Sequence, residues 1–131
     1  MENIKLQAEI LKSLDFLRTK YSYVIAKNES HWLGGVVVEY SKDDIVLSIL
    51  YDKREECFVT KLFSRLFVDK THMCLVEELR GICPSIKKQS ISIDNDEEII
   101  VFLRTFGRCL DQNFLTVIDS YTNGNYFGAI L

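Results

Sequence analysis

The sequence predicts a single α+β domain over residues 1–131: an N-terminal helix, a three- to four-stranded antiparallel meander, a short helix and a long C-terminal helix packed on one sheet face. Residues 36–63 alternate with the period of two that is typical of strands, and residues 95–121 carry an apolar stripe with helical spacing. Because the strands are grouped together instead of alternating with helices, the order favours α+β over α/β. The length of 131 residues fits one domain.

The first segment predicts an amphipathic helix over residues 3–20. Ile10, Leu14 and Leu17 follow one another at steps of four and three, which places them on one helical face. Residues 21–27 alternate imperfectly and predict a short fourth strand at the start of the sheet.

The meander is predicted from three alternating runs separated by two polar turns. The turns cover residues 41–44 and 52–56, and connections of this length suit hairpins. The three predicted strands are Val36–Tyr40, Ile45–Tyr51 and Cys57–Phe63.

The second half predicts two helices. The short one is capped by Asp69 or Thr71 and runs to Arg80, because Gly81 and then Pro84 follow. The acidic run 94–98 opens the long helix, since carboxylates favour the positive end of the helix dipole. The tail, residues 126–131, is apolar and is expected to pack. The residues expected in the core are Leu14, Leu17, Leu47, Ile49, Leu103, Phe106 and Leu110.

Composition and charge exclude several classes of function. The 47% of apolar residues can form a core, and the net charge of −3 lacks the basic excess that nucleic-acid binders use to neutralise phosphates. We find neither a signal peptide nor an apolar run long enough to span a bilayer. We therefore expect a cytoplasmic protein with a protein partner, no nucleic acid and no membrane, and the oligomeric state stays open.

No strong catalytic or metal motif is present. Zinc sites usually show closely spaced ligand pairs, and the nearest cluster, His72, Cys74 and Cys83, has none. Ser85 and Lys88 match the S-x-x-K spacing of some serine enzymes but lack the companion motifs. We predict no catalytic residue, no cofactor, no metal and no disulfide, with the four cysteines reduced and packed as small apolar residues.

The candidate partner-binding residues lie in the predicted turns and in one loop. Turn carboxylates commonly have a conformational role, and the competing interpretation is a charged contact surface. A tryptophan in a loop either covers the core or anchors a partner, because Trp is enriched at binding hot spots. The candidates are Trp32, Asp43, Asp44, Asp52, Glu55 and Glu56.

Short motifs in the first half resemble the immunity proteins of bacterial polymorphic toxin systems. They are a helix ending in Phe-Leu, aromatic residues in the next strand, a Glu-Tyr pair and an Asp-x-Arg turn, seen here as Leu14–Leu17, Tyr21–Tyr23, Val38–Tyr40 and Ile49–Arg54. The resemblance implies a stoichiometric inhibitor of a cognate toxin and assigns no catalytic residue. It does not extend to the second half of the chain.

The sequence therefore predicts a non-enzymatic protein-binding module, with an immunity-type inhibitor as the leading hypothesis. Two alternatives stay open. One is a small cytosolic enzyme whose site is assembled from distant residues, and the other is a regulatory adaptor that uses a strand edge or the long helix.

Overall fold

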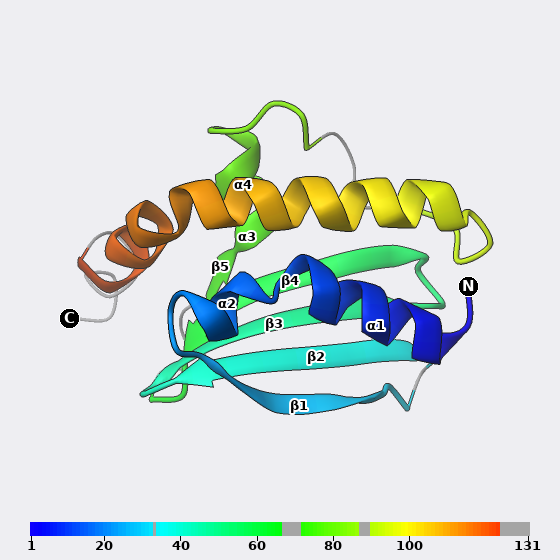
Figure 1. Ribbon diagram of the computed structural model, residues 1–131, viewed down its shortest axis with the longest axis horizontal. Coiled ribbons are helices and arrows are strands. Elements are labelled where there is room, and N and C mark those ends of the chain that lie inside the picture. The colour runs from blue at the N-terminus through cyan, green and yellow to red at the C-terminus, as the bar shows by residue number, and fades with distance from the viewer. Residues whose placement is uncertain (33, 67–71, 87–89, 124–131) are drawn as a thin grey trace.

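The computed structural model of the chain describes residues 1–32, 34–66, 72–86 and 90–123 (Figure 1). The elements are α1 (Asn3–Ser13), α2 (Phe16–Thr19), β1 (Val24–Ser30), β2 (Gly35–Lys42), β3 (Ile45–Asp52), β4 (Cys57–Ser64), β5 (His72–Cys74), α3 (Leu75–Arg80) and α4 (Asp96–Asn123). The strands form one sheet, and α1 and α4 pack against its buried face and against each other. This arrangement confirms the predicted α+β class.

The sheet is an antiparallel meander in which strand order follows chain order, β1-β2-β3-β4-β5. The register places Val38 beside Ile49 and Ile49 beside Thr60. These three residues point toward the helices, because they are fully buried. The three predicted hairpin strands are confirmed as β2, β3 and β4, with ends close to the predicted ones.

Two edges of the sheet differ from the prediction. The fourth strand, β1, covers Val24–Ser30 instead of residues 21–27, because Ser22 takes a left-handed φ of 62° that turns the chain just before the strand begins. The sequence did not predict β5, which pairs with β4. The predicted short helix therefore begins only at Leu75. A strand as short as β5 contains too few residues for alternation to show.

The predicted N-terminal helix is divided into α1 and α2. Leu14 has φ −111° and ψ 16°, which ends α1, and α2 begins after Asp15. The Asp15 carboxylate accepts a hydrogen bond from the Arg18 side chain at 3.2 Å, and the Asp15 main-chain carbonyl accepts one from the Thr19 hydroxyl at 3.3 Å. The break leaves Leu14 and Leu17 fully buried on the same side.

Helix α4 matches the predicted long helix and contains one kink. The Asn95 carboxamide oxygen accepts a hydrogen bond from the Glu98 N–H at 3.1 Å, so an asparagine caps the acidic first turn. Asn113 has φ −120° and ψ 15°, and its Nδ2 donates to the Cys109 carbonyl at 2.9 Å. A side chain that bonds into the helical ladder in this way accounts for the kink.

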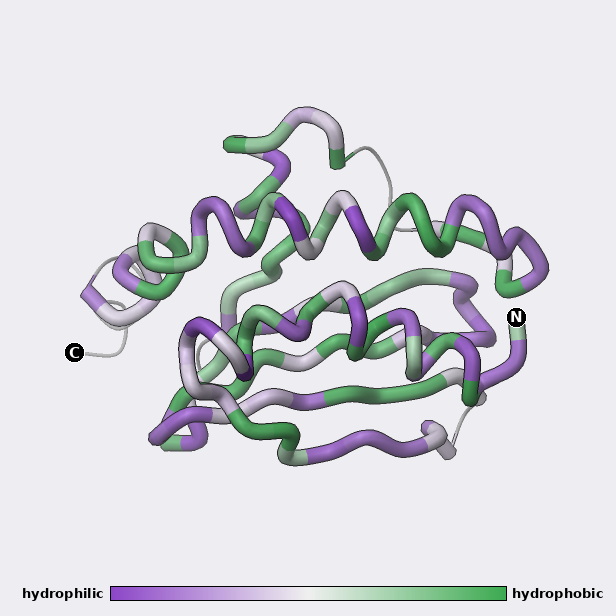
Figure 2. The backbone as a smooth tube through the Cα atoms, viewed as in Figure 1, coloured by the Kyte–Doolittle hydropathy of each residue, from purple (hydrophilic) through white to green (hydrophobic). Residues whose placement is uncertain are grey.

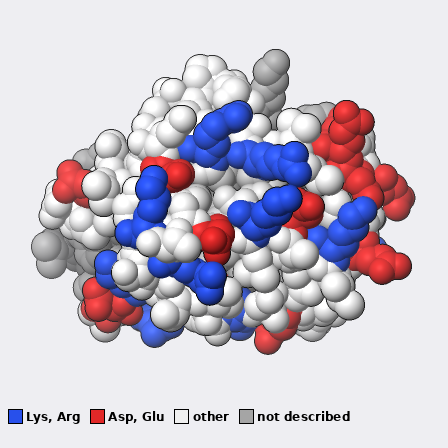
Figure 3. All heavy atoms as spheres, in the orientation of Figure 1, with Lys and Arg blue, Asp and Glu red and all other residues white. Residues whose placement is uncertain are grey.

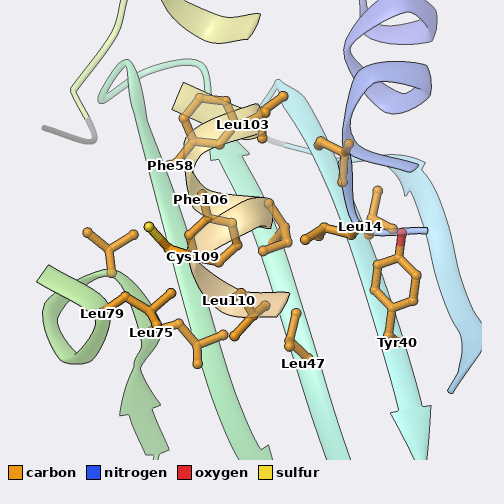
Figure 4. Close-up of a cluster of buried hydrophobic side chains, with 14 of the residues drawn as sticks. Leu14, Tyr40, Leu47, Phe58, Leu75, Leu79, Leu103, Phe106, Cys109 and Leu110 are labelled. Atoms are coloured by element: carbon orange, nitrogen blue, oxygen red, sulfur yellow. The ribbon is translucent and has the colours of Figure 1, made fainter. Parts of the chain in front are cut away.

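The core lies between the helices and one face of the sheet (Figures 2 and 4). All seven residues predicted in the core are fully buried. Phe58 of β4 stacks on Phe102 of α4 with ring centroids 4.7 Å apart. Within the described residues, no helix is long and apolar enough to cross a membrane. The tail that was expected to pack, residues 126–131, lies outside the described residues.

Candidate functional site

Trp32 stands at the tip of the connection between β1 and β2. The Gly34 N–H donates to the His31 carbonyl at 2.9 Å, and the His31 N–H donates to the Gly35 carbonyl at 3.0 Å, which makes the turn tight. Gly35 has a φ of 87°, and a Cβ there would lie 1.9 Å from the Tyr51 carbonyl oxygen, so the position requires glycine. The turn leaves the Trp32 residue 85% exposed. This exposure excludes the interpretation that Trp32 covers the core.

A hollow of about 430 Å³ lies beside this turn, on the sheet face opposite the helices. Strand alternation creates it, because residues that neighbour the core residues along each strand must point to the other face. Its lining comprises Lys27, Glu29, Ser30, His31, Trp32, Val37, Glu39, Ser48, Leu50, Val59 and Lys61. We call it the sheet hollow.

Apolar and polar side chains form adjacent rows across the sheet hollow. In strand order the two rows are Val37-Leu50-Val59 and Glu39-Ser48-Lys61. An antiparallel sheet with a solvated face usually carries polar residues on that face. Val37 is buried, Leu50 and Val59 are half-buried, and Trp32 is exposed. A partly accessible apolar row beside an exposed tryptophan is typical of a surface that contacts another molecule.

The predicted turn acids do not form one surface. Asp43–Asp44 form the β2–β3 turn and Asp52–Glu56 the β3–β4 turn, at opposite ends of β3. Because β3 has 8 residues, the two turns are about 25 Å apart at a rise of about 3.3 Å per residue. Gly35 pairs with Asp52, which puts the Trp32 turn at the β3–β4 end. The structure therefore brings Trp32 together with Asp52, Glu55 and Glu56 and separates it from the other pair.

Asp52 acts within its own turn. Its Oδ1 accepts hydrogen bonds from the N–H groups of Arg54 at 2.9 Å and Glu55 at 3.2 Å, and the Arg54 side chain approaches it to 4.0 Å. This is the conformational role that turn aspartates commonly have. Glu55 and Glu56 are exposed and are the turn carboxylates that a partner could reach.

The start of α4 adds carboxylates to the same end of the molecule. The Glu56 carbonyl accepts a hydrogen bond from the Ile91 N–H at 2.9 Å, which joins the turn to the segment leading into α4. Burial raises the pKa of Tyr51 to about 12, and the nearby charges of Glu56 and Asp94 add to the rise. We call this region, at the end of the molecule where α4 begins (Figure 3), the acidic end. It comprises the turn carboxylates Asp52, Glu55 and Glu56, together with Asp94 near Tyr51 and with Glu97 and Glu98 in the first turn of α4.

Asp96 lies among these acids but is paired inside the molecule. Its carboxylate forms ion pairs with the N-terminal ammonium at 3.2 Å and with Lys5 at 3.4 Å. The hydrogen bond from the ammonium lowers the pKa of Asp96, and Lys5 adds to the effect. Asp96 thus joins the beginning of α1 to the beginning of α4.

The residues considered for metal binding and catalysis are dispersed. Within the described ranges, no group of three or more His, Cys, Asp or Glu side chains could hold a metal, and all four cysteines are free. His72 is exposed on β5, whereas Cys83 lies beside Cys109, whose hydrogen bond raises the pKa of Cys83. The Ser85 hydroxyl is 3.9 Å from the Cys109 sulfur. Lys88, the second residue of the S-x-x-K match, lies outside the described residues.

Basic side chains gather over α1 and α4 (Figure 3). The sequence did not predict this cluster. Lys12, Arg104 and Arg108 line a hollow of about 390 Å³ between these helices. The sequence contains one indication of this cluster: Arg104 and Arg108 are four residues apart, which places them on one helix face. Lys12 joins them only through the packing of α1 on α4.

Comparison with known proteins does not assign the chain to a family. No family model, no curated protein and no solved structure matches it.

Proposed function

We propose that the chain is a non-enzymatic protein-binding module and, more specifically, an immunity-type inhibitor of a bacterial toxin. One observation carries the proposal: the exposed Trp32 lines the sheet hollow and stands at the same end of the sheet as the turn carboxylates Glu55 and Glu56. An aromatic anchor, an apolar row and exposed turn carboxylates therefore lie at or near one end of the sheet. Protein interfaces combine the same components.

The resemblance to immunity proteins supports the finer assignment through the fold. Leu14, Leu17, Tyr40 and Tyr51 belong to the motifs that carry it, and all four are buried. These four residues therefore describe the packing of the helices on the sheet, and of the proposed contact residues only Asp52 belongs to the motifs. The exposed contact residues Trp32, Glu55 and Glu56 lie outside the motifs.

The surface suits a partner with a basic cleft beside an apolar pocket. Many toxin domains attack nucleic acid and have basic clefts, because they bind phosphates. Glu55 and Glu56 would speed the encounter by electrostatic steering, and Trp32 would hold the complex once formed. Main-chain hydrogen bonds of His31 and Gly34 hold the backbone beside Trp32, so little backbone freedom is lost on binding.

The test first asks whether a toxin domain is encoded beside the gene for this chain, and with that domain it measures association and dissociation rates separately. Trp32→Ala should weaken binding by about thirtyfold, mostly through faster dissociation, since a hot-spot residue contributes about 2 kcal/mol or more. Neutralising Glu55 and Glu56 to Gln should slow association at low salt, and the effect should shrink as salt rises. The matched control neutralises Asp43 and Asp44 to Asn, which removes the same charge at the far end of the sheet.

Two outcomes would contradict the proposal at different levels. If the far-end control slows association as much as the near-end variant, and Trp32→Ala dissociates at the wild-type rate, the contact surface is misassigned. If the chain neither binds that toxin domain nor restores growth of cells that express it, the immunity class is wrong.

A further inference from the structure

The helices α1 and α4 cross at a very close approach that leaves a hollow open to solvent. Gly107 of α4 faces the Ser13 carbonyl at the end of α1, and a Cβ on Gly107 would lie only 2.4 Å from that oxygen. Around this contact, Lys12 projects from α1 while Arg104 and Arg108 project from α4. We call the resulting site, of about 390 Å³, the basic hollow.

The cations of the basic hollow differ from their neighbours on the same face. Lys5, Arg18 and Lys20 each pair with an aspartate. Lys12, Arg104 and Arg108 form no ion pair with any residue that the structure describes. Like charges four residues apart on a helix destabilise it by a few tenths of a kcal/mol. Three such cations around one hollow therefore point to an anion that binds there.

The neutral atoms of the basic hollow fit the same interpretation. The Ser13 hydroxyl is buried and, among the described residues, has no hydrogen-bond partner, although buried hydroxyls normally have one. Phe16 supplies an apolar wall. Asp111 also lines the hollow, but Lys20 binds its carboxylate at 2.8 Å. The hollow thus offers three positive charges, a hydroxyl and an aromatic ring.

We propose that the basic hollow binds the phosphoryl group of a small phosphate monoester. Arginine guanidinium groups donate paired hydrogen bonds to phosphate oxygens, and three cations match a dianion better than a single carboxylate. The organic part of the ligand would contact Phe16. The volume lies near the lower end of the range for small-molecule sites, which is about 300–1,000 Å³. A long polyanion fits less well, because the acidic end lies at the beginning of α4.

The experiment titrates the intact chain with phenyl phosphate, inorganic phosphate and a short single-stranded oligonucleotide, at constant ionic strength maintained with chloride. Binding is followed by NMR through the backbone amide signals of α1 and α4. Phenyl phosphate should bind saturably with a Kd below about 1 mM, and more tightly than inorganic phosphate. Replacing Arg104 and Arg108 by Gln should weaken binding at least tenfold. The control replaces Lys42 and Arg65, which have the same total charge at the β2–β3 end, by Gln, and it should bind like the wild type.

Ser13→Ala separates ligand binding from folding. Removing a buried hydroxyl that lacks a partner should leave thermal stability unchanged or raised, yet it should weaken phenyl phosphate binding severalfold. Absence of saturable binding, or an equal loss in the Lys42 and Arg65 control, would overturn the proposal. Tighter binding of the oligonucleotide than of phenyl phosphate, lost in the Arg104 and Arg108 variant, would also overturn it, because the patch would then be a nucleic-acid surface. None of these results depends on the sheet hollow or on a toxin.

Discussion

Gly107→Ala tests the close approach of α1 and α4, because two opposing effects can be compared there. Alanine is favoured over glycine in a helix interior by about 1 kcal/mol. Against this gain, the new Cβ would lie 2.4 Å from the Ser13 carbonyl oxygen and 3.2 Å from its carbon. Ordinary contact begins near 3.4 Å, so the two helices would have to separate by roughly 1 Å. The obstacle is the Ser13 main chain, which no side-chain rotation can move away.

The steric effect should exceed the gain in helix propensity. Overpacking a filled core costs about 1–3 kcal/mol, and a contact with rigid backbone belongs in the upper part of that range. We therefore expect Gly107→Ala to lower the free energy of unfolding by about 1–2 kcal/mol. For a domain of this size, the Tm should fall by roughly 3–10 °C.

Gly81→Ala is the matched control. Gly81 ends α3 with φ −68°, a conformation open to any residue, and its Cβ would meet only the Glu78 carbonyl oxygen, at 3.6 Å. The same substitution there should stabilise the protein by about 0.4–1 kcal/mol, because it restricts the unfolded chain. The two variants should thus shift stability in opposite directions.

Urea unfolding followed by far-ultraviolet circular dichroism provides the measurement. Fluorescence is a poor alternative, because Trp32 is 85% exposed in the folded chain and its surroundings change little on unfolding. If Gly107→Ala proved as stable as the wild type or more so, the helices would be free to separate. The close crossing, and with it the geometry of the basic hollow, would then be wrong.

The remaining predictions concern the core, its tyrosines and the thiols. Leu103→Ala should lower the free energy of unfolding by about 2–5 kcal/mol in urea titration, since Leu103 is fully buried, whereas Val101→Ala on the exposed face of α4 should cost much less. Tyr51→Phe should cost about 1–2 kcal/mol by removing a 2.6 Å hydrogen bond to a carbonyl before α4, whereas Tyr40→Phe should be neutral, because that buried hydroxyl has no partner among the described residues. Burial raises the pKa of Tyr23 and Tyr51 to about 12, above the unfolded value near 10. The unfolded chain therefore releases these protons first, so stability should fall from pH 10 to pH 12 by up to about 1.4 kcal/mol per pH unit for each phenol. Thiol titration of the denatured chain without reductant should find all four cysteines free, and elemental assay should find no zinc.

The parts of the fold that depend on neighbouring residues were predictable. Period-two alternation and turn length specify a hairpin locally, so β2, β3 and β4 were placed correctly. The apolar stripe of the long helix identified the buried face, including Leu103 and Phe106. Features that local periodicity does not encode were missed: β5 pairs with β4, and the predicted helix over residues 3–20 is interrupted at Leu14, although Leu14 and Leu17 still share a buried side.

The candidate surfaces could be predicted from the sequence much less well than the helices and strands, because the surfaces depend on tertiary packing. The sequence by itself determined that Trp32 lies in a loop and that the carboxylates of residues 43–56 lie in turns. Only the meander decided that consecutive turns lie at opposite ends of β3, which separates one pair of acids from Trp32 and adds the acids at the start of α4 to the others. A net charge of −3 is a sum over the whole chain and says nothing of position. The cluster of Lys12 with Arg104 and Arg108 exists because Gly107 lets two helices distant in sequence come into contact. Local sequence specifies secondary structure through short-range sterics and burial, whereas a surface is assembled from residues that only packing brings together.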